Sequence, residues 1–229
     1  MQPAPITITE ARIDGLALRF ATDMERDPIQ RHHRRGAFYE ARELKTLGAF
    51  MPEGGCFLDI GANVGNHSLY AALFWKAGRV IPIEPNPRAR RLLQRNCALN
   101  GLEGVIDLSC LGVGLSDRSQ EGFGMEERQR NLGGARMLPG AGDLQVRRAD
   151  EGLPDLRPDV IKIDVEGMEI AVLEGLGALL DGSPALLVEV DTANAAGFAD
   201  WMQRTGYGEV ARFQRYRRCI NHILRRGRA

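Results

Sequence analysis

Short apolar runs alternate with helix-like segments through most of this chain, and this alternation limits the folds open to it more than any other feature. Residues 66–77 have the periodicity of a helix that ends at Gly78. Asn86 can cap a second helix with Pro87 in its first turn, and Gly101 can end it. The other runs predict strands: FLDI (57–60), VIPI (80–83), VIDLSC (105–110), VIKIDV (160–165) and ALLVEV (185–190). Because uninterrupted apolar strands belong in parallel sheets that helices cover on both faces, we expect an α/β fold with a mostly parallel sheet.

The first 50 residues differ from this pattern. ITIT and LALRF flank Asp14–Gly15, a pair that favours a two-residue hairpin turn. Residues 23–50 then form a charged, helix-like lead-in. We therefore expect a hairpin and helical lead-in over residues 1–50 and one α/β domain over residues 51–229. Within that domain residues 115–150 are Gly-rich and charged, which predicts an irregular loop over the site.

The charge balance excludes a further class of protein. Thirty Lys and Arg residues stand against 30 Asp and Glu residues, and the pI is about 6.9. A chain without net charge is not expected to coat nucleic acid, so we expect no nucleic-acid partner.

Targeting signals and metal-binding spacings are missing from the sequence. The four Cys are scattered, without the spacing of a zinc site or a disulfide framework. The N-terminal residues lack the basic and apolar regions of a secretory signal, and the apolar stretches fall far short of the roughly 20 residues of a membrane span. We therefore expect a cytoplasmic protein without a transmembrane segment. The oligomeric state stays open, a homo-oligomer included.

A glycine-containing turn follows the first predicted strand. It reads DIGANVG from Asp59 to Gly65, at the carboxyl end of the sheet where open α/β folds bind ligands. The dinucleotide fingerprint G-x-G-x-x-G fails because Asn63 and Asn66 stand at two of its glycine positions, and the chain contains no phosphate loop. The remaining pattern, D-x-G-x-x-x-G, is typical of enzymes that bind S-adenosylmethionine.

A carboxylate ends the second predicted strand. Glu84 lies 19 residues after Gly65, close to the offset of about 20 residues at which a carboxylate accepts ribose hydroxyls. A solvated strand end, stopped by Pro85 and Pro87, is the alternative interpretation. The order and spacing of the glycine turn and this carboxylate together favour an adenosyl ligand.

Three charged residues alternate in the fourth predicted strand. Lys162, Asp164 and Glu166 would share one face of that strand. Charges in an apolar strand are costly unless they are paired or lie at its open end. One interpretation is an internal lysine–carboxylate bridge that orders the strand end. The other places Asp164 and Glu166 on the substrate side of the cofactor.

Several of these segments extend into longer motifs, which occur in the order FLDIGANVGNHSLY, VIPIEPNP, NCALNG, VRRADEGLPDLRPDVIKIDVEGMEIAVLEG and LLVEV. With GAFYE before them and NLGGARM among them, they resemble FkbM-type methyltransferases over about residues 36–190. The resemblance implies a class I, Rossmann-like fold that uses S-adenosylmethionine. Such a fold is a three-layer sandwich around a seven-stranded, mostly parallel sheet with an antiparallel last strand. YGEVARF and CINHILR can supply its final hairpin.

The resemblance also implies a reaction and a set of cofactor contacts. The family mostly methylates hydroxyl groups of sugars, lipids or secondary metabolites, which implies O-methylation of a small-molecule acceptor. The glycine turn would cradle the methionine end of the cofactor, Asp59 would meet its amino group, and Glu84 would hold the ribose. Asp107 is either an adenine contact or a plain surface carboxylate. The expected cofactor contacts are, in chain order, Asp59, Gly61, Asn63, Gly65, Glu84, Asn86 and Asp107.

Methyl transfer to a hydroxyl needs alignment of the two reactants and a group that removes the proton. Asp164 is the predicted base and Glu166 the second candidate. The expected substrate contacts are Tyr39, Glu40, Lys162 and Glu189. An Mg²⁺ ion held by Asp164, Glu166 and Glu189 stays open because hard oxygen ligands suit it, but no metal is predicted.

Two other functions remain open on the sequence. One is methylation of nucleic acid. Enzymes that methylate amino groups of nucleic acids generally carry a four-residue motif after the fourth strand: Asp, Asn or Ser, then two prolines, then an aromatic residue. This chain has DVEG (164–167) there instead. The other is a non-catalytic module that only binds S-adenosylmethionine. Asn63 excludes a nicotinamide-dependent oxidoreductase.

Three local features carry further expectations. Pro82 removes a hydrogen-bond donor from the second strand, which is therefore expected to be bulged or unpaired there. His32 and His33, flanked by arginines, predict either a solvated cationic segment or a lid. Residues 212–229 contain seven Arg and no Asp or Glu. Arg forms paired hydrogen bonds with phosphate and carboxylate groups. The arginines around the two histidines and those of the C-terminal segment therefore favour an anionic acceptor, such as a phosphorylated sugar or lipid.

Overall fold

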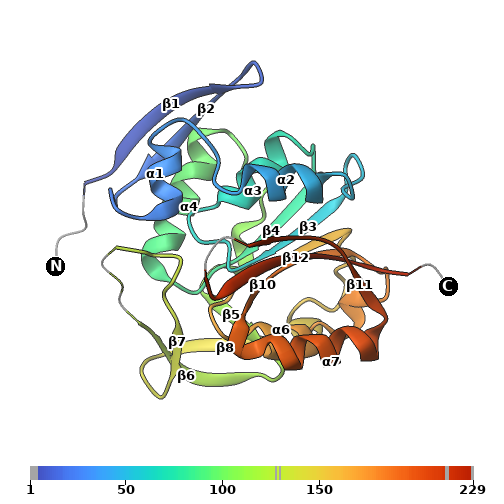
Figure 1. Ribbon diagram of the computed structural model, residues 1–229. Helices are drawn as coiled ribbons and strands as arrows, with labels where there is room; N and C mark the ends of the chain where they lie inside the picture. Colours follow the sequence, from blue (N-terminus) through green and yellow to red (C-terminus); the bar gives the residue numbers. More distant parts are fainter. Residues whose placement is uncertain (1–4, 127, 129, 215–216, 228–229) are drawn as a thin grey trace.

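A mostly parallel sheet forms the centre of the molecule (Figure 1). The computed structural model describes residues 5–126, 128, 130–214 and 217–227. Within these residues the sheet has six strands in the order β11-β12-β10-β9-β3-β4. Their bounds are β3 (Cys56–Ile60), β4 (Arg79–Ile83), β9 (Val160–Ile163), β10 (Ala185–Asp191), β11 (Tyr207–Gln214) and β12 (Cys219–Arg226). β12 is antiparallel to both neighbours and the β4-β3-β9-β10 run is parallel, so the predicted sheet and its final hairpin are confirmed.

The seventh strand, predicted at residues 105–110, does not form among the described residues. This segment makes a single bridge to Val80 and then a short 3-10 helix, η1 (Leu108–Cys110). The N–H and C=O of Val80 are both bonded to the segment. The next residue of β4 that faces this edge is Pro82, which has no N–H to offer. Pairing therefore stops after one bridge.

Of the two outcomes expected at Pro82, the bulge is absent, and the loss of pairing occurs on the outer edge of the sheet alone. β4 pairs with β3 without a register shift, and Asp59 lies opposite Pro82. Alternate residues of a strand direct their N–H groups to opposite neighbours, so Pro82 lacks its donor only on the outer edge of the sheet. An edge strand tolerates proline there because no ladder bond is lost.

Helices cover both faces of the sheet (Figure 1). One face carries α2 (Ala41–Gly48), α3 (Asn66–Leu73) and α4 (Pro87–Leu99), and the other α5 (Ala149–Gly152), α6 (Glu169–Gly175) and α7 (Ala195–Thr205). Successive strand residues alternate between the two cores, with Phe57 packed on the first side and Leu58 on the second. The N-cap of Asn86 and the buried face of α4 agree with the prediction. α3 ends at Leu73 rather than at Ala77.

The predicted N-terminal hairpin is confirmed. β1 (Thr7–Ile13) and β2 (Leu16–Thr22) are antiparallel and join through Asp14 and Gly15, whose φ angles of 48° and 85° suit a type I′ turn. The backbone N–H of Ala21 in β2 donates to Oδ1 of Asn96 in α4 at 2.6 Å. α1 (Pro28–His33) then connects the hairpin to α2. The lead-in thus packs directly on the helices of the main sheet.

Residues 115–150, expected as an irregular loop, instead form much of a second sheet. Within the described part of the chain its order is β5-β8-β6-β7, with bounds β5 (Val113–Ser116), β6 (Gln120–Met125), β7 (Met137–Pro139) and β8 (Leu144–Arg148). These strands set single apolar residues such as Phe123 and Val146 among polar residues and glycines. No apolar run marks them, which is why the sequence pattern did not predict them.

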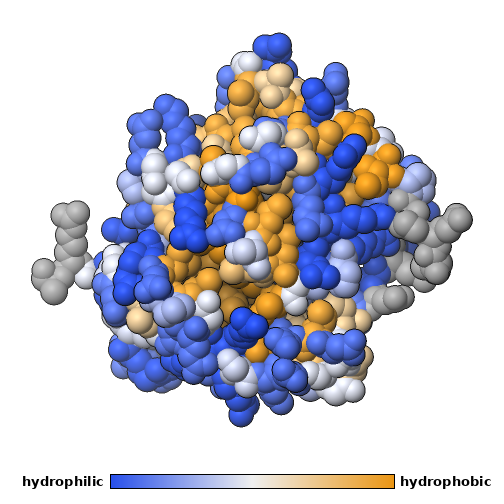
Figure 2. Space-filling model, turned by 180° about the vertical axis from the view of Figure 1, so that it is seen from behind, coloured by the Kyte–Doolittle hydropathy of each residue, from blue (hydrophilic) through white to orange (hydrophobic). Residues whose placement is uncertain are grey.

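The surface mixes polar and apolar residues. Figure 2 shows apolar residues gathered in a central band of one face, with hydrophilic residues around them. The large apolar side chains exposed among the described residues are Ile6, Ile8, Leu16, Leu138 and Val210. Among the described residues, no helix has the length and apolar character needed to cross a membrane.

Candidate functional site

The turn after β3 lies between the carboxyl ends of the neighbouring strands β4 and β9. Gly61 has a φ of 79°, and its N–H and that of Ala62 both donate to the carbonyl oxygen of Ile83, at 2.9 and 3.0 Å. A Cβ on Gly61 would overlap the carbonyl oxygen of Asp164, which follows β9. Only a residue without a side chain lets the chain pass this close to the end of β9.

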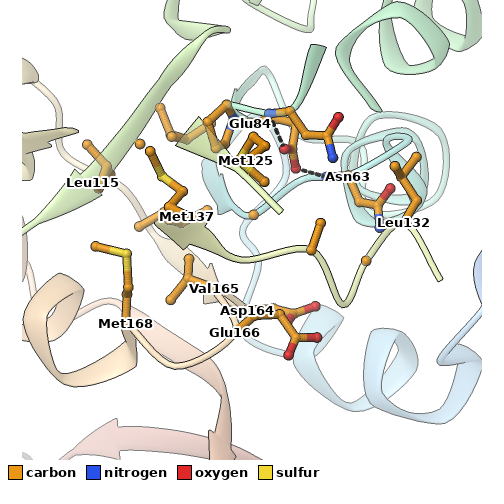
Figure 3. Close-up of a pocket in the computed structure, with 18 residues that line it drawn as sticks. Asn63, Glu84, Leu115, Met125, Leu132, Met137, Asp164, Val165, Glu166 and Met168 are labelled. Carbon is orange, nitrogen blue, oxygen red and sulfur yellow. Dashed lines mark hydrogen bonds between the residues drawn. The ribbon is translucent and has the colours of Figure 1, made fainter. Parts of the chain in front are cut away.

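Glu84 is held at the end of β4 by the backbone of two other residues. Its Oε2 accepts the N–H of Asn63 at 2.7 Å, and its Oε1 accepts the N–H of Asn86 at 2.8 Å (Figure 3). Burial raises the pKa of Glu84 to about 7, although the two backbone hydrogen bonds act to lower it. Each carboxylate oxygen has a second lone pair, so both oxygens can still accept a hydroxyl from a ligand.

A pocket opens beside Glu84, at the carboxyl ends of β3, β4 and β9. Figure 3 shows Asn63 and Glu84 on one side of it and Asp164 and Glu166 on the other. Its apolar lining consists largely of Leu115, Met125, Leu132, Met137, Val165 and Met168. Most of these residues belong to the segment expected as a loop. That segment does lie over the site, but its single apolar residues gave no signal that they line a pocket.

Asn63 adds a polar group with no partner. Its side chain is 7% exposed, and its Oδ1 has no hydrogen-bond partner among the described residues. A buried amide oxygen left unpaired costs about 1–3 kcal/mol. The pocket therefore offers a buried acceptor next to the Glu84 carboxylate, which fits a ligand that carries both hydroxyl and amino groups. An adenosyl amino acid such as S-adenosylmethionine has both.

Two of the predicted site residues lie inside the sheet instead of in the pocket. The fully buried Asp59 accepts the hydroxyl of Ser68 at 2.6 Å and lies 3.4 Å from Nζ of Lys162. Lys162 also donates to the carbonyl oxygen of Gly61 at 2.7 Å and lies 3.6 Å from Asp164. Burial acts to lower the pKa of Lys162, but the two carboxylates raise it and prevail. This is the internal bridge that orders the strand end.

Three carboxylates converge beside this bridge. Asp164, Glu166 and Glu189 each place one oxygen within 4.8 Å of the others. Burial raises the pKa of Glu189 to about 9 and that of Glu166 to about 7, and the Asp164 charge adds to both shifts. The expectation that Lys162 and Glu166 share a strand face is wrong, because β9 ends at Ile163. Glu166 lies in the following turn with a φ of 49°.

The lead-in reaches the edge of this group through Glu40. The Glu40 carboxylate is buried, lies 3.1 Å from Nε2 of His67 and accepts Nδ2 of Asn221 at 2.9 Å. The backbone of Tyr39 is bonded in both directions to the side chain of Asn66. Neither Tyr39 nor Glu40 lines the pocket beside Glu84, although Glu40 lines a small cavity that it shares with Asp164 and Glu189.

Asp107 lies apart from the pocket. It caps η1 by accepting the N–H of Ser109 at 3.1 Å and pairs with Arg79 at 2.9 Å. Of the two interpretations left open, this is the position of a surface carboxylate. We therefore do not include Asp107 in the proposed cofactor site.

His33 is neither solvated nor part of a lid. It is fully buried, stacks on Phe20 with ring centroids 4.3 Å apart, and bonds to Oδ1 of Asn66 at 3.1 Å. Because that oxygen only accepts, the bonded Nε2 carries the hydrogen. Burial lowers the pKa of His33 to about 4. The lead-in is thus fixed to the start of α3 by an imidazole that stays neutral.

Acid should destabilise the fold through His33. The unfolded imidazole takes up its proton near pH 6.5 and the folded one near pH 4, so the free energy of unfolding falls as the pH drops between these values. At about pH 5 the loss amounts to about 2 kcal/mol. His33→Gln, which cannot titrate, should lose less stability between about pH 7 and about pH 5 in urea unfolding. An equal loss in both proteins would contradict this.

The arginines of the C-terminal segment are only partly accessible to a ligand. Arg225 and Arg226 lie over the rings of Phe50 and Tyr207, 5.3 and 5.1 Å from the ring centroids. Arg215 and Arg228 lie outside the described residues. The anionic acceptor remains a proposal.

The sequence of this chain is similar to those of known methyltransferases. Residues 59–216 match the model of the methyltransferase FkbM domain. Methyltransferase sdnD of Sordaria araneosa is 28% identical over 167 residues, which cover 56% of this chain and 62% of sdnD. Hexuronic acid methyltransferase AglP of Haloferax volcanii is 27% identical over 186 residues, which cover 79% of this chain and 73% of AglP. The chain thus spans less than two thirds of the length of sdnD.

The fold has counterparts among solved structures. The structure of P. horikoshii TYW2 in complex with MeSAdo superposes with a TM-score of 0.54 at 15% sequence identity, over 96% of this chain and 71% of that one. An identity this low shows the fold alone. The class I, Rossmann-like methyltransferase fold implied by the sequence motifs is confirmed; its main departure, within the part of the chain that the structure describes, is that no strand forms at residues 105–110 after α4.

Proposed function

The chain belongs to the FkbM methyltransferase family, and on this premise we propose that it transfers the methyl group of S-adenosylmethionine to a hydroxyl oxygen of a sugar, lipid or secondary metabolite. One observation carries the proposal: a single pocket has Glu84 on one side and Asp164 with Glu166 on the other. The first carboxylate suits the ribose of the cofactor, and the other two suit removal of a proton from an acceptor.

The cofactor side of the pocket would bind by hydrogen bonds and apolar contact. Glu84 accepts the ribose hydroxyls with the lone pairs that the backbone leaves available. The unpartnered Oδ1 of Asn63 accepts an N–H of the ligand, next to the turn at Gly61. The apolar wall that contains Met125 and Met137 packs on the adenine ring and excludes water from it.

The acceptor side would position and deprotonate a hydroxyl. When bound, S-adenosylmethionine supplies a methyl group on a positively charged sulfur. The acceptor oxygen bonds to this carbon as the carbon–sulfur bond breaks, and the thioether of S-adenosylhomocysteine leaves with the electron pair. Asp164 takes the hydroxyl proton, with Glu166 as the second candidate. Most of the rate enhancement comes from holding oxygen and methyl carbon in line at about 3–3.5 Å.

The acceptor we propose is anionic, with a sugar acid as the first choice. The relative AglP is named for a hexuronic acid, and Arg clusters flank the lead-in histidines and fill the C-terminal segment. A direct test measures S-adenosylhomocysteine release from a glucuronide and from the matching neutral glucoside. Faster turnover of the glucuronide, reduced by salt, supports an anionic acceptor. Equal turnover that salt does not change contradicts it.

Asp164→Asn should separate catalysis from cofactor binding. The amide keeps the size of the side chain but cannot accept the proton, so kcat should fall by about 10²–10⁴-fold. The Kd for S-adenosylmethionine, measured by calorimetry, should stay within about threefold of the wild-type value. The control is Glu151→Gln, which changes an exposed carboxylate of α5 and should leave both values unchanged. Near-normal turnover by Asp164→Asn would rule out Asp164 as the base.

A further inference from the structure

The convergence of three carboxylates has the geometry of a cation site. Asp164, Glu166 and Glu189 offer one oxygen each, and these atoms lie within 4.8 Å of one another. Oxygen ligands at roughly 2.0–2.1 Å from one Mg²⁺ ion are at most about 4.2 Å apart, so shifts of a few tenths of an ångström would bring all three oxygens onto the same ion. Each of the three side chains is partly exposed, which gives an ion access from solvent.

A fourth oxygen points independently to a ligand here. Asn221 of β12 lies directly opposite Glu189 of β10 and is only 1% exposed. Its Nδ2 donates to the Glu40 carboxylate, which can only accept, so Oδ1 lies on the other side of the amide. This Oδ1 is buried and has no hydrogen-bond partner among the described residues. Asn221 lines the same small cavity as Asp164 and Glu189.

The neighbouring lysine does not balance the charge of this group. Lys162 is shared between Asp59, at 3.4 Å, and Oδ2 of Asp164, at 3.6 Å. Its single positive charge therefore serves two carboxylates already. Glu166 and Glu189 add two more carboxyl groups beside it, and a bound cation would offset the repulsion among them.

We propose that Asp164, Glu166, Glu189 and Oδ1 of Asn221 bind a hard divalent cation, Mg²⁺ or Mn²⁺. All four ligand atoms would be oxygens, three of them from carboxyl groups, and such a donor set suits these ions. The set contains no thiolate or imidazole, which are the ligands that Zn²⁺ favours.

The role of the ion rests on the proposed function. A hydroxyl that coordinates a divalent cation becomes more acidic, so proton transfer to a nearby carboxylate becomes easier. The ion would also give the carboxylate of a sugar acid a positively charged partner beside Asp164, Glu166 and Glu189. The proposed anionic acceptor and the acidic site are then compatible.

Electron paramagnetic resonance of Mn²⁺ tests the site on the full chain without an acceptor. The wild-type protein should remove free Mn²⁺ signal with a stoichiometry of one ion per chain, and Mg²⁺ should compete. Glu189→Gln should weaken Mn²⁺ binding by at least about tenfold because one charged ligand is lost. Glu103→Gln, an exposed glutamate distant from the pocket, is the control and should bind Mn²⁺ within about twofold of wild type.

Two outcomes would overturn the proposal: no saturable Mn²⁺ binding below about 1 mM, or equal binding by wild type and Glu189→Gln. Circular dichroism checks that the variant folds, and if it does not, Glu166→Gln in the partly exposed turn after β9 carries the same expectation. Calorimetry with S-adenosylmethionine on the same samples separates the two proposals. Cofactor binding without Mn²⁺ binding removes the cation site alone, whereas a wild-type protein that fails to bind the cofactor contradicts the proposed function.

Discussion

Glu84→Ala should abolish measurable binding of S-adenosylmethionine, with Kd at least about 100-fold weaker than in the wild-type protein. The change removes the carboxylate proposed to accept the ribose hydroxyls. It also leaves the N–H groups of Asn63 and Asn86 without their partner, at about 1–3 kcal/mol for each buried donor. Because Asn63 itself lines the pocket, the loss of its anchor displaces a second proposed ligand contact. Titration calorimetry measures the effect.

Glu84→Gln should fail almost as completely. An amide has one oxygen where the carboxylate has two, so its NH₂ group would face one of the two backbone N–H donors. Asp107→Ala is the matched control, since Asp107 pairs with Arg79 outside the pocket. It should bind the cofactor within about twofold of wild type. Normal affinity in Glu84→Ala would overturn the proposed cofactor site, and a large loss in Asp107→Ala would return that residue to it.

Gly61→Ala should destabilise the protein by roughly 2–5 kcal/mol and also prevent cofactor binding. Two costs combine at this position. The φ of 79° is unfavourable for alanine, and the new Cβ would overlap the carbonyl oxygen of Asp164. Relief of the overlap requires the turn and the end of β9 to move apart. Thermal unfolding should shift downward by about 5–20 °C for a chain of this size.

Gly101→Ala separates these two costs. Gly101 has a similar φ of 63°, but a Cβ there would meet no atom within 4 Å. It should therefore lose only the conformational part, about 1 kcal/mol, and bind S-adenosylmethionine normally. If Gly61→Ala were no less stable than Gly101→Ala, the close approach of the turn to β9 would not be a constraint on this fold.

Local patterns predicted the elements that carry their own signals. Asp14–Gly15 marks a hairpin through the φ angles it adopts, and Asn86–Pro87 marks a helix start through a cap and a missing donor. The apolar sequences of strands β3, β9 and β10 predict that these strands are buried on both faces. The second sheet carries no such signal, because its strands bury single residues among polar ones. The strand expected near Ile106 is limited by Pro82, a residue far from it in sequence.

The same distinction applies to the site residues: some follow from local sequence patterns, and others depend on the assembled sheet. Glu84 was predictable because its spacing from the glycine turn is a property of one strand–helix–strand unit. The buried position of Asp59 was not, because which side of a strand faces the sheet interior depends on neighbouring strands. For Lys162 the sequence left two interpretations open, and the structure shows the internal bridge. His33 stands among cationic residues in the sequence, and only the packed structure shows that it stacks on Phe20 and bonds to Asn66.

Local patterns in the sequence are enough to predict the α/β fold, the family and the position of Glu84 at the end of β4. Periodicity, turn residues and motif spacing act over a few residues and can be read without a partner. The assembled sheet is needed to bring Glu189 of β10 close to Asp164 and Glu166 from the segment after β9, and to place Asn221 of β12 in one small cavity with Asp164 and Glu189. That convergence depends on strand register and on the left-handed turn at Glu166, which exist only once the sheet is assembled.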